Sequence, residues 1–142
     1  LERVSVFGVD LEKMLTLINQ RIEVLLDAEH LIGHSYFIPL ISIEDETARQ
    51  QALAVLFKDK LLPLLQEYFF DDHQRIGWVL NDPAKKNPNR FITTDEALKD
   101  NLPGLQQLFP PDIADQLMDR RYRINELAFA RPEAYKGIVS VE

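Results

Sequence analysis

The chain has 142 residues, of which 46% are hydrophobic and 27% are charged, so it is expected to be globular rather than disordered. Its net charge of −7 argues against direct binding of nucleic acid by this chain. Cysteine is absent, which excludes a disulfide framework, a thiolate metal site and a cysteine nucleophile.

The first predicted element is an amphipathic helix that begins after Asp10. Its apolar residues recur at helical spacing, at Leu11, Met14, Leu15, Ile18, Ile22, Leu25 and Leu26. Asp10 is a suitable N-cap, because its carboxylate can accept hydrogen bonds from free backbone N–H groups. Leu17 and Val24 extend the apolar surface beyond this stripe, so we expect a central helix. The pattern fades near Glu29, and Gly33 would end any continuation.

A second helix is predicted from the run SIED. Ser42 can cap it, and Asp45 follows three residues later, as in a capping box. The apolar stripe of this helix consists of Leu53, Leu56, Phe57, Leu61, Leu64, Leu65 and Tyr68. Pro63 interrupts the stripe and predicts a kink or a new helix start, because proline lacks an N–H and clashes with the preceding turn. A further short helix over DHQRIGWVL would bury Ile76, Val79 and Leu80.

The run NDPAKKNPNR, residues 81–90, predicts a loop because it is rich in proline and asparagine. Lys85, Lys86 and Arg90 could meet a phosphate there. The interpretation that we favour is a solvated basic loop, which is how such charge runs usually occur.

The remaining elements are short. FITT predicts a strand, and Thr93 with Glu96 forms a capping box for a helix through Leu98. PPDIADQLM predicts a helix that begins with proline, RYRINELAF a strand, and RPEAYKGI one helical turn. The fold class is therefore mainly α: a small helical bundle with a short C-terminal β element. We expect one domain over residues 1–142, with a helical core at 10–82 and an extension at 83–142 packed on it.

No motif of catalytic chemistry stands out. The sequence contains no phosphate-binding loop, no dinucleotide fingerprint and no nucleophile elbow. Asp71 and Asp72 are paired carboxylates, which are usually solvated. His30 and His34 have the i, i+4 spacing of zinc ligands, but Gly33 lies between them and the glutamate of the H-E-x-x-H motif is missing. We therefore predict neither a catalytic residue nor a metal site.

The run HLIGHSYF, residues 30–37, is the strongest candidate site. Gly33 ends one segment, and His34 or Ser35 begins the next. A helix N-terminus is an anion site, because its free N–H groups point outward. A histidine and a serine at such a place could contact a phosphate or a ribose.

The same residues carry a resemblance to a known family. LTLINQRIEVLLDAEHLIGHSYF and KLLPLLQEYFFDD resemble the C-terminal part of the McrB-type AAA+ GTPases, the motors of modification-dependent (5-methylcytosine) restriction systems. Asn19, Arg21, Ile22 and residues 32–37 and 62–69 match the family pattern. The resemblance covers residues 10–82 well and 122–138 loosely.

The resemblance implies a helical lid that follows an α/β nucleotide domain. Gly33, His34 and Ser35 would face the nucleotide in the region called sensor 2. Since the block contains no sensor arginine, His34 or Ser35 would make that contact. The chain alone would be inactive and without a cofactor, whereas the full-length parent would use GTP or ATP with Mg²⁺.

The implied partners are the N-terminal AAA+ α/β domain of the same chain, neighbouring ring subunits and a McrC-like nuclease subunit. The LLQEYFF end could contribute to subunit contact, although burial in the core of the lid is the interpretation that we favour. Two other functions stay open: a stand-alone helical adaptor, and a metal-dependent hydrolase that uses His30, His34 and Asp71 or Asp72.

The chain is also expected to be cytoplasmic and to make no contact with a membrane. No apolar run approaches the roughly 20 residues of a membrane helix, and no signal peptide is apparent. Because it starts at Leu1 and enters a helical pattern almost at once, we expect it to be part of a longer protein.

Overall fold

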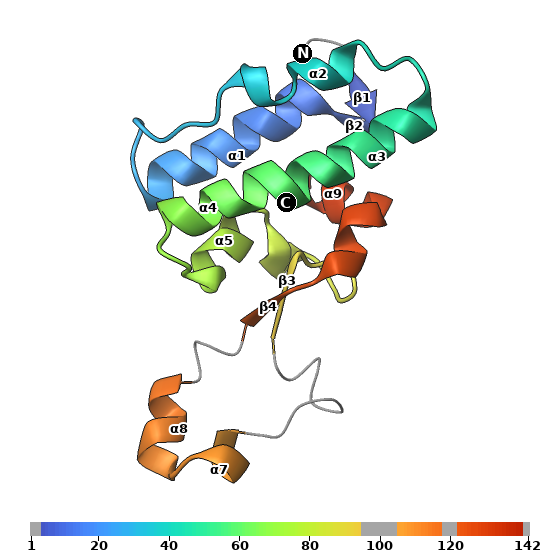
Figure 1. The fold of residues 1–142 in the computed structure, drawn as a ribbon. Helices are drawn as coiled ribbons and strands as arrows, with labels where there is room; N and C mark the ends of the chain where they lie inside the picture. Colours follow the sequence, from blue (N-terminus) through green and yellow to red (C-terminus); the bar gives the residue numbers. More distant parts are fainter. Residues whose placement is uncertain (1–3, 95–104, 118–121, 141–142) are drawn as a thin grey trace.

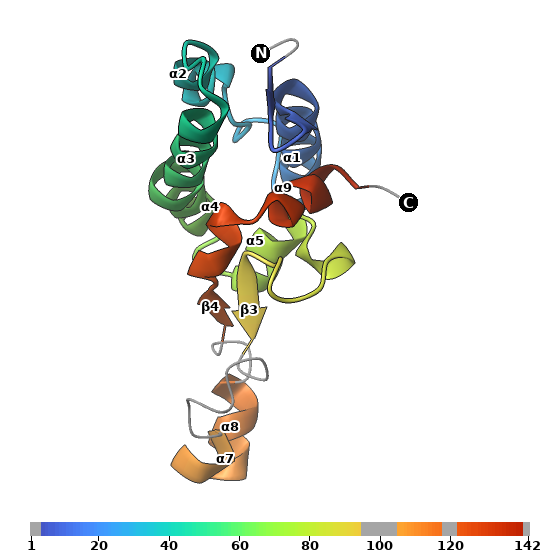
Figure 2. The same ribbon diagram turned by 90° about the vertical axis from the view of Figure 1, so that its right-hand side faces the viewer.

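The computed structural model describes residues 4–94, 105–117 and 122–140. In this part the chain is mainly helical, with two small antiparallel strand pairs, which confirms the predicted fold class (Figure 1). Helix α1 and the helical rod that contains α3 and α4 lie on two sides of the bundle, and α9 and α5 lie between them at its base (Figure 2). None of the helices in the described residues is long and apolar enough to span a membrane.

A hairpin that was not predicted precedes α1. Strands β1 (Ser5–Val6) and β2 (Val9–Asp10) pair antiparallel, with Val6 opposite Val9. The two turn residues, Phe7 and Gly8, have φ angles of 56° and 76°, as the tight turns of two-residue hairpins require. The hairpin buries both valines in the core and brings Asp10 to the start of α1.

Helix α1 spans Leu11–Leu25 and confirms the first prediction. The Asp10 carboxylate accepts hydrogen bonds from the backbone N–H groups of Glu12 and Lys13. The residues buried along the helix are Leu11, Met14, Leu15, Ile18 and Ile22. The additional apolar surface expected at Val24 is wrong, since this side chain is 86% exposed. Val24 lies two residues beyond Ile22, which places it on the opposite side of the helix.

The N-cap of α3 (Glu46–Leu56) is Asp45, whose carboxylate accepts a hydrogen bond from the N–H of Ala48. The predicted cap at Ser42 is wrong. Ser42 lies at the end of the short helix α2 (Ile38–Ile41), and its hydroxyl donates to the carbonyl of Pro39. The helix therefore begins later than the SIED pattern indicated.

A π-helical turn, Phe57–Leu61 (η2), joins α3 to α4 (Leu62–Tyr68). Within it, the N–H of Leu62 donates to the carbonyl of Phe57, five residues earlier. Pro63 follows in the first turn of α4, which confirms the predicted kink or new helix start. The wider turn gives the proline ring space beside the backbone that a regular α-helix would not provide.

Helix α5 (His73–Val79) is capped by Asp72, and it buries Ile76 and Val79 as predicted. A short 3₁₀ helix η3 (Asp82–Ala84) follows, and then β3 (Ile92–Thr94) pairs antiparallel with β4 (Tyr122–Ile124). The predicted strand at FITT is confirmed. Thr93 lies inside this strand, opposite Arg123, and the helix predicted through Leu98 lies outside the described residues.

The C-terminal elements are shorter or longer than predicted. Helices α7 (Leu105–Leu108) and α8 (Pro111–Leu117) lie beyond the β3–β4 pair, away from the bundle (Figure 1), and α8 begins with proline as predicted. The strand predicted over RYRINELAF covers only its β4 part, because a 3₁₀ helix η5 (Glu126–Ala130) replaces the remainder. Helix α9 (Pro132–Val139) has two turns rather than one.

Tyr135 of α9 lies at the centre of an aromatic cluster. Its ring stacks on Phe7 at 5.0 Å between centroids and meets the edges of Phe57 and Phe91 at 4.9 and 5.4 Å. Its hydroxyl donates to the carbonyl of Phe129 at 2.7 Å, which provides the acceptor that a buried phenol needs. Burial raises the pKa of this phenol well above its usual value.

A buried ion pair holds the 81–90 loop. Asp82 accepts hydrogen bonds from the N–H groups of Phe91 and Ile92 and from Lys85 Nζ at 3.0 Å. Both charged side chains are buried. The Lys85 stem packs so close to Gly137 that a Cβ there would lie 2.7 Å from it. The prediction of a solvated basic loop is therefore wrong for Lys85, because its charge is satisfied within the fold.

The core stripe of α1 generates the first prediction. Replacing Leu15 or Ile18 with alanine is expected to lower the free energy of unfolding by about 2–5 kcal/mol, because each change leaves a cavity. Val24→Ala on the same helix is the matched control and should change it by less than about 0.5 kcal/mol. Urea unfolding measures all three. Core variants that lose no more than the control would contradict the buried stripe.

The ion pair generates a second prediction. Asp82→Asn is expected to lower the free energy of unfolding by about 3–5 kcal/mol, because it leaves the buried Lys85 ammonium without its counter-charge. The double variant Asp82→Asn, Lys85→Met removes both charges and should recover most of this loss. If the double variant lost as much stability as the single variants Asp82→Asn and Lys85→Met lose together, the two charges would not be coupled.

The third prediction concerns pH. Burial lowers the pKa of Lys85 from 10.5 to about 8, against the opposing effect of Asp82. Between these values the unfolded lysine keeps a proton that the folded lysine has released, so the stability contributed by this site rises with pH. Urea unfolding at about pH 7, 8.5 and 10 should show the wild type gaining stability relative to Lys85→Met. If the wild type instead lost stability relative to Lys85→Met as the pH rises, the pKa of Lys85 would not be lowered in the folded state.

Candidate functional site

The 32–37 block is held on α1 by one amide side chain. Asn19 Nδ2 donates to the carbonyl of Ile32 at 3.0 Å, and its Oδ1 accepts from the N–H of the same residue at 2.7 Å. This pair of bonds fixes the backbone of Ile32 as a neighbouring strand would. The side chains of Ile32 and Phe37 are buried and hold the two ends of the block in the core.

Between these two anchors, Gly33, His34 and Ser35 are exposed. His34 begins the 3₁₀ helix η1 (His34–Tyr36), which confirms that a new helix starts at this point. Gly33 is its N-cap, with an ordinary extended backbone at φ −76° and ψ 154°. A Cβ at Gly33 would meet Ser35 Oγ at 3.6 Å, an ordinary contact. The glycine is therefore not required by its backbone angles, and α1 ends well before it.

The arrangement offers side-chain donors rather than a strong helix dipole. A three-residue helix aligns few peptide dipoles, so its N-terminus attracts an anion only weakly. The His34 imidazole and the Ser35 hydroxyl remain as groups that can bind an acceptor such as phosphate oxygen. Because Asn19, Ile32 and Phe37 fix the backbone, the two side chains are presented from a rigid base.

The side chains of Arg49 and Arg21 are both engaged in hydrogen bonds within the fold. The Arg49 guanidinium donates to the carbonyls of Leu40, Ile43 and Ser5, which joins α3 to α2 and to the N-terminal hairpin. Arg21, on α1, donates to the carbonyls of Val79 and Ile138. Both side chains therefore serve as structural clamps.

The structure does not join the other candidate residues into one centre. His30 Nδ1 lies 2.6 Å from Asp27 Oδ1, and the His30 ring meets the edge of Tyr68 at 5.0 Å. Asp72 caps α5, and Asp71 lies in the turn before it. In the described ranges, no three histidine, aspartate or glutamate side chains are grouped so that they could hold a metal ion.

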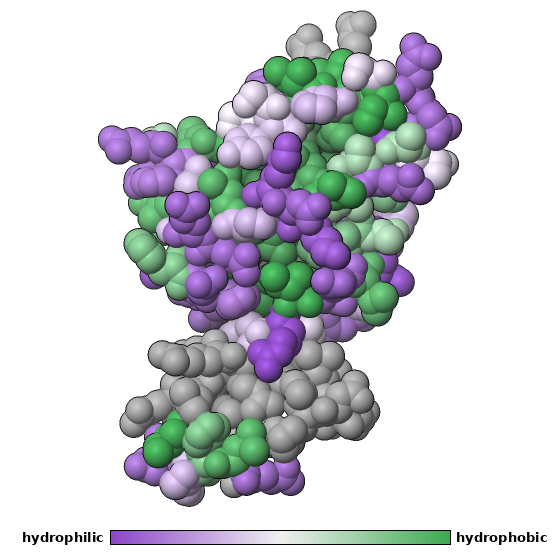
Figure 3. Space-filling model, in the orientation of Figure 1, coloured by the Kyte–Doolittle hydropathy of each residue, from purple (hydrophilic) through white to green (hydrophobic). Residues whose placement is uncertain are grey.

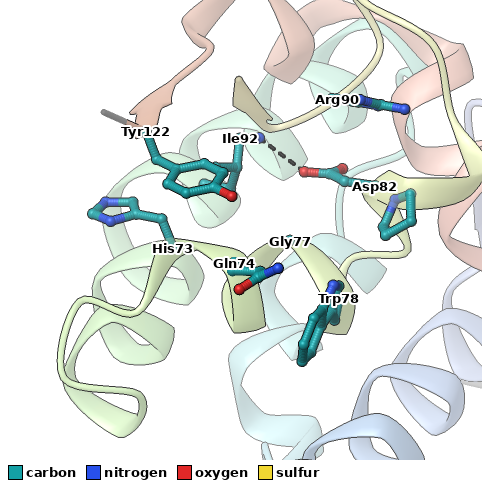
Figure 4. A pocket seen from close by; sticks show the side chains of 9 residues that line it. His73, Gln74, Gly77, Trp78, Asp82, Arg90, Ile92 and Tyr122 are labelled. Carbon is teal, nitrogen blue, oxygen red and sulfur yellow. Dashed lines mark hydrogen bonds between the residues drawn. The ribbon is translucent and has the colours of Figure 1, made fainter. Parts of the chain in front are cut away.

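A shallow pocket of about 270 Å³ lies between α5 and β3 (Figure 4). His73 and Tyr122 border one end, Trp78 lies below, and Arg90 stands at the opposite end. Arg90 Nε donates to the carbonyl of Lys85, so the phosphate site suggested for Lys85, Lys86 and Arg90 does not form around a free Lys85. Sequence reasoning missed this pocket, because pairing of β3 with a distant strand brings Tyr122 to α5.

Apolar side chains also gather on the part of the molecule that lies beyond β3 and β4. Leu108, Phe109 and Ile113 of the α7–α8 segment are exposed, and green apolar atoms mark this segment in the space-filling view (Figure 3). The helical patterns that predicted α8 gave no indication of where its apolar side would lie.

Comparison with known proteins assigns the helical core. Residues 10–77 match the family described as McrB, alpha-helical lid domain. No curated protein and no solved structure matches the chain. The matched residues contain α1, the anchored block at 32–37 and the α3–α4 rod, and so include residues 19–22, 32–37 and 62–69, on which the resemblance mainly rested. The match does not extend to residues 122–138, where the resemblance was loose. Residues 10–77 of this chain are therefore similar to the alpha-helical lid domain of McrB.

Proposed function

We propose that this chain is the lid of a McrB-like, nucleotide-driven AAA+ motor. In this role it closes over a nucleotide bound by the α/β domain of the same polypeptide and contributes to ring assembly. The observation that carries the proposal is the family match over residues 10–77. The rigidly anchored, exposed block that contains His34 and Ser35 supports it.

Gly33, His34 and Ser35 would form the nucleotide-facing surface of the lid. The guanidinium groups of Arg21 and Arg49, on α1 and α3, are committed to backbone carbonyls. A phosphate contact from the block itself therefore falls to His34 and Ser35, both of which can donate a hydrogen bond to a phosphate oxygen. The nucleotide would be GTP or ATP with Mg²⁺, bound mainly by the α/β domain.

Closure would depend on the stiffness of the lid. The backbone of the block is bonded to α1, and α1 buries its stripe against the core, so a contact at His34 moves α1 with it. The lid could in this way pass the state of the nucleotide to a neighbouring subunit as a rigid body. A McrC-like nuclease subunit is the further partner that we propose for the assembled ring.

The fourth prediction tests the nucleotide-facing block in the complete motor protein. His34→Ala and Ser35→Ala should each weaken nucleotide binding or hydrolysis by roughly 1.5–3 kcal/mol, the value of one hydrogen bond to a charged group. Thermal stability should be nearly unchanged, because both side chains are exposed and neither caps a helix.

The matched controls are Ser140→Ala, at an exposed serine, and His73→Ala, at a half-buried histidine, both outside the block. Nucleotide titration and phosphate release measure all four variants. If His34→Ala and Ser35→Ala both retain parental hydrolysis, the block is only part of a connection between helices. A motor without any nucleotide response would favour the adaptor function instead.

A further inference from the structure

The pocket between α5 and β3 takes no part in the proposed nucleotide role (Figure 4). Its lining residues come from α5, η3, β3, β4 and the loop before β3, and none of them belongs to the 32–37 block. Its volume of about 270 Å³ lies just below the roughly 300–1,000 Å³ of typical small-molecule sites. The space therefore suits one ring system that carries a small substituent.

Aromatic side chains give the pocket flat walls. The His73 and Tyr122 rings lie parallel to within 4°, with 6.5 Å between their centroids, and they join the start of α5 to β4. Trp78 lies below them on α5 and is 41% exposed. Its open indole face offers a planar ligand an apolar contact that this chain does not itself supply. The walls therefore favour an aromatic ring over an aliphatic chain.

The polar side chains of these walls offer hydrogen-bond donors. In the part of the chain that the structure describes, Trp78 Nε1, the Tyr122 hydroxyl and the Gln74 amide have no hydrogen-bond partner. The Tyr122 hydroxyl and the Gln74 amide are turned toward the interior of the pocket (Figure 4). Each of the three groups can donate to an oxygen atom, so the pocket matches a ligand with oxygen acceptors.

The charge at the pocket favours an anion. Arg90 Nε donates to the carbonyl of Lys85 at 2.8 Å, which holds the guanidinium in place. No carboxylate within residues 4–94, 105–117 and 122–140 forms an ion pair with Arg90. Asp82 also lines the pocket, but its oxygens accept from two backbone N–H groups and from the Lys85 ammonium, which balances its charge. The guanidinium of Arg90 therefore remains available for a planar carboxylate or a phosphate.

Gly77 keeps the floor of the pocket open. It is buried inside α5, where glycine lowers helix stability relative to alanine. The fold does not require it, because a Cβ there would lie 3.6 Å from Asp82 Oδ2 and 3.9 Å from Ile92 Cβ, which are ordinary contacts. Both neighbours also line the pocket, so this Cβ would occupy part of the space between α5 and β3. A ligand in the pocket explains this glycine, whereas packing within the chain does not.

We propose that this pocket binds a small planar aromatic acid, with its ring against Trp78 and Tyr122 and its anionic group at Arg90. The inference does not depend on the proposed nucleotide role, because it uses no residue of the 32–37 block. A free aromatic carboxylic acid and a mononucleotide both combine a planar ring with an anion. The probes described next distinguish these two sources.

The test is calorimetric titration of the complete protein with 4-hydroxybenzoate, with its neutral analogue 4-hydroxybenzamide, and with AMP. The acid should bind with a millimolar or lower dissociation constant, and the amide should bind about tenfold more weakly or less, because it lacks the charge that Arg90 recognises. AMP binding belongs to this pocket only where the pocket variants weaken it. AMP that binds more tightly than the acid and is weakened by those variants would support the site with a phosphate as its anion.

Two variants of the lining residues locate the binding. Arg90→Gln should weaken binding of the acid by about tenfold or more and leave binding of the amide unchanged. Arg75→Gln removes the same charge from α5 outside the pocket and is the matched control, which should bind the acid as the wild type does. Gly77→Ala should weaken binding of both aromatic probes while it raises the thermal midpoint. A residue that served the fold alone would not combine a gain in stability with a loss of binding.

Three results would overturn the inference: a wild-type protein that binds neither the acid nor AMP at millimolar concentration, equal binding of the acid and the amide, or binding that Gly77→Ala leaves intact. Gly77→Ala decides the question even where Arg90→Gln does not fold. Binding of the acid that depends on both residues, in a protein without nucleotide hydrolysis, would support the pocket and contradict the nucleotide function.

Discussion

The fold depends on burying one phenol ring from the end of the chain. The Tyr135 hydroxyl can leave water only because the carbonyl of Phe129 accepts its hydrogen bond, and this bond fixes α9 against η5. The same ring lies against Phe7, Phe57 and Phe91, so it orders the N-terminal hairpin, the π-helical turn and the start of β3 together. The family match ends within α5, yet a ring far beyond it completes the core around the matched helices.

Sequence reasoning succeeded where a local pattern determines structure alone. The stripe of α1 and the break at Pro63 follow from periodicity and from the covalent shape of proline. Sequence reasoning failed where contact with a distant segment determines the start of a helix or the burial of a side chain. Ser42 and Asp45 are both good caps, and clamping of the preceding loop by Arg49 fixes where α3 begins. From the sequence, Lys85 resembles an ordinary surface lysine. Its burial depends on Asp82, whose position is fixed by the N–H groups of residues 91 and 92, and no local pattern indicates that contact.

The residues of the candidate site could be predicted from the sequence, but the contacts that hold its backbone in place could not. The run at 32–37 indicated a helix start with exposed polar groups, and the structure has one at His34. The reason for its rigidity is Asn19, whose amide binds the backbone of Ile32 across a gap in sequence that no periodicity reveals. Phe69 and Phe70 show the same limit, because adjacent aromatic residues look equivalent until the turn that ends α4 sends one inward and one outward.

The π-helical turn sets the rotational phase between the two halves of the α3–α4 rod. Each residue of an α-helix advances the chain by about 100° around its axis, and the π turn absorbs one extra residue in a single loop of backbone. Phe57, Leu61 and Leu65 can therefore all face the core, while Lys58, Asp59 and Lys60 all face solvent. A one-residue deletion in this turn would rotate α4 by a quarter turn or more. The π-helical turn thus determines which side chains of α4 face the core and which face solvent.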